Sequence, residues 1–158
     1  MADFTAVKKN LEARGFSVTT FRTAAEAADY LDKAVDGVSV GFGGSATLDE
    51  LGLYERLAAH NDVFWHWKAE NTQAARRQAM TADMYFSSVN GLAESGELIN
   101  IDGVGNRIAA TLYGHKKVWI VAGKNKLAPT YDEALWRARN IAAPKNAQRL
   151  RAKTPCAV

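Results

Sequence analysis

The chain has 158 residues, of which 47% are hydrophobic and 23% charged, and its formal net charge is +3. This length and composition predict one soluble globular domain with its own core, and the single cysteine, Cys156, excludes an internal disulfide framework or cysteine-ligated cluster. No apolar run approaches the roughly 20 residues that span a bilayer, and residues 1–15 predict a charged amphipathic helix rather than a signal peptide, so we expect a cytoplasmic protein.

The positive charge is concentrated near the C-terminus. Six cations and no acids occur there, namely Arg137, Arg139, Lys145, Arg149, Arg151 and Lys153. Because no aromatic side chains alternate with these cations, the pattern favours a solvated face of terminal helices over a nucleic-acid-binding surface. A nucleic-acid binder would need an affinity that falls steeply as salt concentration rises.

The N-terminal part of the chain predicts a helix, a strand and a second helix. Asp3 is expected to cap a helix that ends at Gly15. Residues 16–21 alternate in polarity and contain Thr and Val, which predicts a strand. Thr23 and Glu26 have the spacing of a capping box, so a helix should run from there to about residue 34.

The predicted elements then continue in the same alternation. Strands are expected at residues 38–42, 63–67, 84–89 and 117–122, the last of them central and buried. Helices are expected at residues 47–59, 71–80, 130–141 and 144–150, two of them opened by the capping boxes Thr47 with Glu50 and Thr130 with Glu133. Arg76 and Arg77 should point outward from their helix. Residues 108–112 fit either a short helix or a short strand.

This order predicts an α/β fold with a mostly parallel sheet and helices on both faces. Ligands of such sheets bind outside the carboxyl ends of the strands. Three polar segments follow predicted strands, at residues 41–47, 90–107 and 123–126. We therefore expect these segments to converge on one edge of the sheet.

The first segment, GFGGSATL at residues 41–48, is rich in glycine and lies between a strand and a helix. Free backbone N–H groups and two hydroxyls at the start of a helix favour an anion site. Its candidate ligand-binding residues are Gly41, Gly43, Gly44, Ser45 and Thr47. A tight turn without a ligand is the alternative. A nicotinamide cofactor is a third reading, because the segment fits G-x-G-x-x-A, although no acid ends the next strand.

The second segment, NGLAESGELINIDGVGNR at residues 90–107, is the most informative feature of the chain. It is rich in glycine, asparagine and carboxylates, so little of it is expected in the core. Such a run is either a disordered linker or a loop that holds chemistry. The apolar residues Leu98, Ile99 and Ile101 favour the loop, because a linker does not need them.

The side chains of this second segment suggest two roles. Glu94 or Asp102 could act as a general base or as a nucleophile toward an acyl group. The candidate ligand-binding residues are Asn90, Gly103, Gly105, Asn106 and Arg107, because arginine and asparagine can hold an anion next to backbone without Cβ atoms. The alternative is that Asp102 and Gly103 form a turn while Asn106 and Arg107 bond carbonyls of the loop itself.

The third segment supplies two cations just past the most apolar strand. Lys124 and Lys126 could neutralise an anion held by the first segment, Asn125 between them is a further candidate ligand-binding residue, and a solvated loop is the alternative. No metal site is expected, because the three histidines, His60, His66 and His115, lack metal-ligand spacing and are each expected to be structural. No Ser-His-Asp arrangement is visible. Four tryptophans in a small domain suggest a homodimer interface.

Much of the chain, from about residue 41 to 155, resembles the LUD domain (lactate-utilization domain) family. The resemblance is carried by GFGGSATLDELGL, by NGLAESGELINIDGVGNR, and by KVWIVAGKNKLAPTYDEALWRARNIAAPKNAQRL. It implies the fold shared by ribose-5-phosphate isomerase, glucosamine-6-phosphate deaminase and CoA transferases. The stretch VGFGGSATL resembles the phosphate loop of the isomerase, and Glu94-Ser95-Gly96 resembles the CoA-transferase motif whose glutamate takes the acyl group.

The resemblance also implies a pathway. Family members act with iron–sulfur proteins in the oxidation of L-lactate to pyruvate. Many relatives continue past a Thr-Pro-Cys motif into a cysteine-bearing tail, whereas this sequence ends at residue 158, so we expect iron–sulfur only through a partner protein. The first aspartate of the isomerase's catalytic motif is absent near residues 90–94, which argues against isomerase activity.

Two functional hypotheses follow. The first is an accessory or ligand-binding subunit of a lactate-oxidising system, which binds an anionic small molecule and shows no turnover alone. The second is a free-standing enzyme on a phosphorylated or acyl-CoA substrate, with Glu94 or Asp102 as base or nucleophile. Neither hypothesis includes a nucleic-acid or membrane partner.

Overall fold

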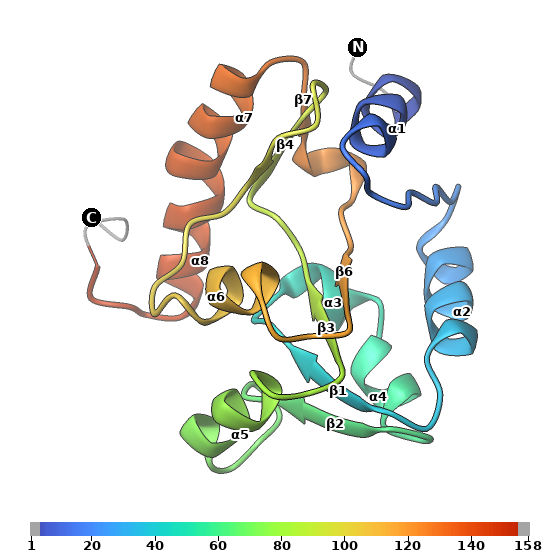
Figure 1. Ribbon diagram of the computed structural model, residues 1–158. Helices are drawn as coiled ribbons and strands as arrows, with labels where there is room; N and C mark the ends of the chain where they lie inside the picture. The colour runs from blue at the N-terminus through green and yellow to red at the C-terminus, as the bar shows by residue number, and fades with distance from the viewer. Residues whose placement is uncertain (1–3, 155–158) are drawn as a thin grey trace. The chain divides into compact units, whose positions relative to one another are not determined.

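The structure is a computed structural model that describes residues 4–154, and it divides the chain into two compact units (Figure 1). Unit 1 consists of Met1–Thr20, Val89–Val104 and Ala122–Val158, and unit 2 consists of Phe21–Ser88 and Gly105–Val121. The predicted cap Asp3 and the cysteine Cys156 lie outside the described residues.

Unit 2 is built on a parallel four-stranded sheet. The strands are β1 (Ser39–Phe42), β2 (Asp62–Trp65), β3 (Met84–Ser87) and β6 (Lys117–Ile120), in the order β2-β1-β3-β6. Five helices belong to this unit: α2 (Ala24–Ala34), α3 (Ala46–Glu50), α4 (Leu53–Leu57), α5 (Thr72–Ala79) and α6 (Asn106–Leu112). The predicted α/β class is confirmed, and residues 108–112 belong to a helix.

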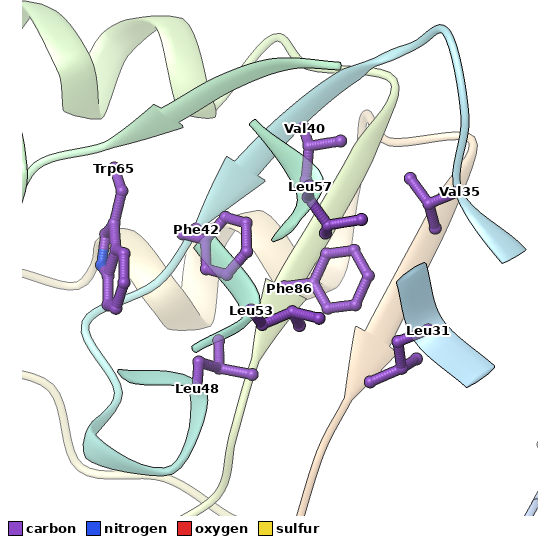
Figure 2. Close-up of a cluster of buried hydrophobic side chains, with 9 residues drawn as sticks. All are labelled: Leu31, Val35, Val40, Phe42, Leu48, Leu53, Leu57, Trp65 and Phe86. Carbon is purple, nitrogen blue, oxygen red and sulfur yellow. The ribbon is translucent and has the colours of Figure 1, made fainter. Parts of the chain in front are cut away.

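The two faces of this sheet bury different side chains. On one face Phe42 stacks on Phe86, with ring centroids 5.4 Å apart, and the cluster is completed by leucines and Val35 from α2, α3, α4 and their connections (Figure 2). The opposite face buries Tyr85 with Ala79 of α5 and Ala110 of α6. Helices therefore cover both faces, as the alternation of strands and helices predicts.

Polar contacts fix the amino ends of three strands in unit 2. The carboxylate of Asp83 accepts a hydrogen bond from Ser39 Oγ at 2.8 Å and pairs with Lys116 Nζ at 2.6 Å. These contacts, led by Lys116, lower the pKa of Asp83 to about 2. A single carboxylate thus joins the starts of β1, β3 and β6.

A histidine joins the end of α4 to α2 and to the residues that follow α2. His60, just after α4, contacts Asp32 with Nε2 at 3.0 Å and Asp36 with Nδ1 at 2.9 Å. The hydrogen bond to Asp32 is the largest of the effects that raise the pKa of His60 above its ordinary value.

Unit 1 contains a small mixed sheet that the sequence did not predict. Its strands are β4 (Gly91–Ala93), β5 (Leu98–Ile99) and β7 (Leu127–Ala128), in the order β5-β4-β7, with β4 antiparallel to β5 and parallel to β7. Its helical segments are α1 (Phe4–Ala13), η1 (Lys124–Lys126), α7 (Tyr131–Arg137), the π-helical turn η2 (Ala138–Ala142) and α8 (Ala143–Arg149). One core cluster of this unit consists of alanines around Ile99, and Val7, Leu11 and Leu92 are buried as well.

The prediction that residues 90–107 form a polar loop with little core content is wrong in its first half. Residues 91–99 are a β-hairpin in which all of β4 is buried. The small residue Gly91 lies so close to α7 that a Cβ atom there would be 2.4 Å from the carbonyl oxygen of Ala134. Glycine and alanine can therefore form a core when helix and strand backbones approach closely.

Four other local predictions are corrected. Residues 16–21 are mostly exposed and pair with no strand among the described residues. The helix predicted at 47–59 is split by Gly52, which has φ 60°, and its cap is Ser45, which accepts a hydrogen bond from the N–H of Leu48, rather than Thr47. The strand at 117–122 is at the edge of the sheet instead of its centre, since apolar content does not determine strand order.

The fourth correction concerns Arg76, which does not point outward. Its side chain is half-buried and its Nε atom is fully buried, whereas Arg77 is exposed as predicted. The capping pattern of Thr130 and Glu133 is confirmed, as is that of Thr23 and Glu26. No helix among residues 4–154 has both the length and the apolar character needed to cross a membrane.

Candidate functional site

The carboxyl edge of the four-stranded sheet gathers several polar residues within unit 2. β1 leads into Gly43 and Gly44, β2 leads into His66, and β3 ends at the buried Ser87. The N-terminal end of α6, where Arg107 lies, reaches the same edge. Because ligands of parallel sheets bind at this edge, it is the candidate site of unit 2.

Each glycine of the first segment is required by a different neighbour, which a Cβ atom at that position would contact. A Cβ atom at Gly41 would lie 2.4 Å from the carbonyl oxygen of Ala79 and 2.9 Å from a ring carbon of Tyr85, so Gly41 allows α5 to pack on β1. A Cβ atom at Gly44 would lie 3.0 Å from Nε1 of Trp67. Gly41 is thus buried under α5, and it lies inside β1 instead of in the segment that follows the strand.

Gly43 brings the first segment into contact with Arg107. A Cβ atom at Gly43 would lie 2.8 Å from Arg107 Cγ and 3.1 Å from Ser87 Oγ. The N–H of Gly43 donates to the carbonyl oxygen of Phe86 at 2.8 Å, so that donor is already used within the sheet. The predicted proximity of residues 41–47 and Arg107 is thus observed, with the arginine stem lying over the glycine.

The remaining residues of this edge occupy the starts of two short helices. Ser45 is buried and caps α3 with its hydroxyl, and Thr47 is half-buried in the first turn. Gly105, with φ 79°, precedes α6, and Asn106 is the first residue of that helix. The left-handed conformation of Gly105 explains why glycine is needed there.

His66 is predicted from the sequence to be structural, and no sequence pattern connects it to the site. His66 is 8% exposed, and its Nδ1 atom is buried without a hydrogen-bond partner. Burial, and secondly the charge of Arg76, lower the pKa of His66 to about 4. The signal that could have identified it is its position directly after β2, at the level of Gly43 in β1.

In unit 1, Arg137 joins two of the predicted segments. Its Nε atom donates to the carbonyl oxygen of Asn125 at 2.7 Å, and its Nη1 atom donates to the carbonyl oxygen of Asn90. The side chain of Asn90 accepts a hydrogen bond from the N–H of Ile101 at 3.0 Å. Burial lowers the pKa of Arg137 below its ordinary value. The sequence had assigned Arg137 to a solvated face, which is wrong.

The two candidate catalytic carboxylates lie at opposite ends of the hairpin. Glu94 is half-buried, and its backbone is held by Ala128, which accepts from its N–H at 2.9 Å, and by Asn10, which donates to its carbonyl oxygen at 2.7 Å. Its neighbour Glu97 is instead paired with Arg14 at 3.1 Å. Asp102 is half-buried and follows β5, next to the exposed Gly103.

The third segment adopts the turn η1, in which Lys124 and Asn125 are exposed and Lys126 is half-buried.

The predicted site residues fall into two groups, one in each unit. Gly41 to Thr47 and Gly105 to Arg107 belong to unit 2, and Asn90 to Gly103 and residues 124–126 belong to unit 1. Convergence of all three segments stays a prediction. Within residues 4–154, no group of three potential metal-binding side chains occurs.

Comparison with known proteins gives one finding. The family described as the LUD domain matches residues 4–158, which covers almost the whole chain and includes every candidate site residue. This match associates the chain with lactate utilization. No curated protein matches the sequence.

Proposed function

We propose, since this chain belongs to the LUD domain family, that it is an accessory or ligand-binding subunit of a system that oxidises L-lactate to pyruvate. In this role it binds an anionic small molecule at its glycine-rich segments and depends on partner proteins, which carry any iron–sulfur clusters, for turnover. The proposal includes a cytoplasmic location.

The observation that carries the proposal is the contact between Gly43 and Arg107 at the carboxyl edge of the parallel sheet. The stem of Arg107 lies against the glycine, which keeps a cation beside the first segment. Ser45 and Thr47 add hydroxyls close by in the chain. A guanidinium group with neighbouring hydroxyls suits a phosphate or carboxylate better than a neutral ligand.

The first test is a thermal-shift panel with inorganic phosphate, sugar phosphates, CoA, acetyl-CoA, NAD, L-lactate and pyruvate. A ligand at about 100 times its dissociation constant stabilises by about 2.7 kcal/mol, which is a shift of roughly 5–10 °C for a chain of this size. We expect such a shift for one class of anions, and its loss in Arg107→Gln. The matched control is Arg77→Gln, which removes an exposed arginine far from any glycine-rich segment in the sequence. A shift that persists in Arg107→Gln refutes the site.

A second candidate function is favoured by the surroundings of Glu94. Its backbone is fixed on both sides, while no ion pair holds its carboxylate within residues 4–154. A positioned carboxylate of this kind suits a free-standing enzyme on a phosphorylated or acyl-CoA substrate, with Glu94 or Asp102 as nucleophile or base. Glu94→Gln should then abolish turnover of the isolated protein, whereas Glu97→Gln, at a residue paired with Arg14, should not. Absence of turnover by the isolated wild-type protein refutes this alternative.

A further inference from the structure

A row of polar residues lies above the core on the face of the sheet that α5 and α6 cover. The register aligns Gly41 with Phe64 of β2 and with Tyr85 of β3, and these residues pack against the two helices. Two positions further on in the same register lie the residues that directly follow β2 and β1 and the last residue of β3. They are His66, Gly43 and Ser87. The row next to the apolar core thus contains an imidazole, a hydroxyl and no large apolar side chain on these three strands.

Two members of this environment carry buried polar atoms without partners. The Nδ1 atom of His66 and the Nε atom of Arg76 are both buried, and neither has a hydrogen bond in the structure. Arg76 lies on α5, between the buried Ala75 and the buried Ala79 of the turn that packs on the sheet. Buried polar groups in folded proteins are almost always paired, so two unpaired nitrogens from neighbouring elements require an explanation.

Arg76 brings a positive charge to this face of the sheet. No acidic side chain among residues 4–154 is within ion-pair distance of Arg76. Lys68, two residues after His66, pairs with two carboxylates, those of Asp49 and Glu55. His66 stays neutral near pH 7, because burial and the charge of Arg76 lower its pKa to about 4. Arg76 therefore brings a positive charge to the row, and the neutral imidazole of His66 has one donor and one acceptor.

We propose that Arg76 and His66 bind the carboxylate group of a small organic acid at the carboxyl edge of the sheet. The planar guanidinium group matches a carboxylate, which leaves the imidazole to hydrogen-bond either the carboxylate or a neighbouring hydroxyl or carbonyl of the ligand. This inference rests on the proposed function only in taking the ligand to be an anion, and it names the chemical class and two further binding residues.

The size of the ligand is limited by the neighbouring side chains. On one side of the row the stem of Arg107 lies over Gly43, with Ser87 Oγ beside it. The ring of Trp67, the residue after His66, packs with the core of the opposite face, so it does not enter the row. Because the stem of Arg107 occupies this side of the row, we take the ligand to be a monocarboxylic acid of a few carbon atoms rather than a nucleotide.

Isothermal titration of the purified full-length protein with sodium pyruvate, sodium L-lactate and sodium acetate tests the proposal, at constant ionic strength in chloride. We expect wild type and Arg77→Gln to bind at least one of these carboxylates equally. Arg76→Gln and His66→Gln should weaken that binding at least tenfold, and Arg76→Lys, which keeps the charge but not the planar group, should weaken it less. Thermal unfolding without ligand identifies any variant that fails to fold, in which case Arg76→Lys alone decides.

A spectroscopic readout distinguishes direct contact from an indirect effect. The imidazole ¹⁵N resonances of His66, assigned by their absence in His66→Gln, should shift on addition of the bound carboxylate while those of His60 and His115 do not. Unchanged His66 resonances at saturating ligand overturn the proposal.

The outcomes also separate this inference from the proposed function. Binding of inorganic phosphate or CoA without binding of any carboxylate overturns the inference and leaves the proposed anion site intact. Carboxylate binding that is lost in Arg107→Gln but unchanged in Arg76→Gln and His66→Gln has the same meaning. Carboxylate binding that is lost only in the Arg76 and His66 variants supports the inference and refutes the Arg107 site. Absence of binding by every anion refutes both.

Discussion

Replacing Gly41 by alanine should destabilise the protein through backbone packing, with no ligand involved. The added Cβ atom would lie 2.4 Å from the carbonyl oxygen and 2.9 Å from the Cα atom of Ala79, and both atoms belong to the backbone of α5. Real Cβ contacts are essentially never shorter than 3.0 Å, so the carbonyl group has to move by at least about 0.6 Å. The side chain of Tyr85, at 2.9 Å, blocks the easiest direction of relief.

The magnitude follows from the cost of overpacking. Inserting a methyl group into a packed core typically costs about 1–3 kcal/mol, and a chain of this length loses roughly 2–4 °C in melting temperature per kcal/mol. We therefore expect Gly41→Ala to lower the melting temperature by roughly 2–12 °C, as measured by circular dichroism or calorimetry without ligand.

The matched control is Gly103→Ala. A Cβ atom at Gly103 would meet nothing within 4 Å, and its backbone is not in the left-handed region. This variant should be as stable as wild type or more stable by a few tenths of a kcal/mol to about 1 kcal/mol, through the reduced freedom of the unfolded chain. If Gly41→Ala keeps the wild-type melting temperature, α5 does not approach β1 as closely as described, and Gly41 is again a candidate for direct ligand contact.

Four further outcomes are expected. Gly91→Ala should destabilise about as much as Gly41→Ala, because its Cβ atom would also lie 2.4 Å from a helix carbonyl, and chemical denaturation measures this. Asp83→Asn should remove part of the sensitivity of the protein to acid. The pKa of Asp83 is lowered to about 2, so its ionised carboxylate stabilises the fold above its ordinary pKa near 3.8, and this contribution is lost as pH falls toward 2. Urea titrations should therefore show that the free energies of unfolding of wild type and variant converge near pH 2. His60→Asn should have the opposite pH dependence. Because the pKa of His60 is raised, the protonated imidazole stabilises the fold below pH 6.5, and this contribution disappears as pH rises through the folded-state pKa. A difference in free energy of unfolding between wild type and variant that widens as pH rises contradicts this assignment. Arg137→Met should destabilise by about 1–3 kcal/mol, because two backbone carbonyls lose a charged donor.

The sequence predicts best the strands that are short apolar runs and the helices that begin with a capping side chain. β1, β2 and β3 are short apolar runs, and Thr23, Asn71 and Thr130 each accept a hydrogen bond at the start of a helix. Strand order is not encoded in that way. The apolar segment KVWIVA forms the edge strand β6, where Lys117 Nζ lies 3.8 Å from the ring centroid of Trp119 and helps to cover it.

The hairpin of unit 1 escaped prediction for a different reason. Its buried strand β4 consists of Gly91, Leu92 and Ala93, and small residues of this kind also occur in loops. They become core residues only because the backbone of α7 approaches them closely, and that approach depends on residues more than forty positions away along the chain. No local pattern carries this information.

The sequence predicts residues at the ends of strands as a binding site, and the structure brings two of them, Gly43 and Arg107, into contact, while their role in binding stays a prediction. Gly43, Ser45 and Arg107 were identified because glycine, hydroxyl and cation patterns are visible in the sequence. His66 was predicted to be structural, because the histidines lack metal-ligand spacing, and Arg76 was predicted to point outward from its helix. They come together only when α5 folds back onto the sheet after β2, which is a consequence of the crossover connection and not of sequence spacing.

The glycine pattern of residues 41–46 itself argues against a dinucleotide. In a dinucleotide-binding turn the second glycine leaves room for the pyrophosphate to approach the backbone. Here the space beside Gly43 is taken by the stem of Arg107, at 2.8 Å from the position of a Cβ atom, and the N–H of Gly43 is bonded to the carbonyl of Phe86. The glycine therefore makes room for a side chain. The space that the pyrophosphate of NAD would need beside Gly43 is therefore occupied by the protein itself.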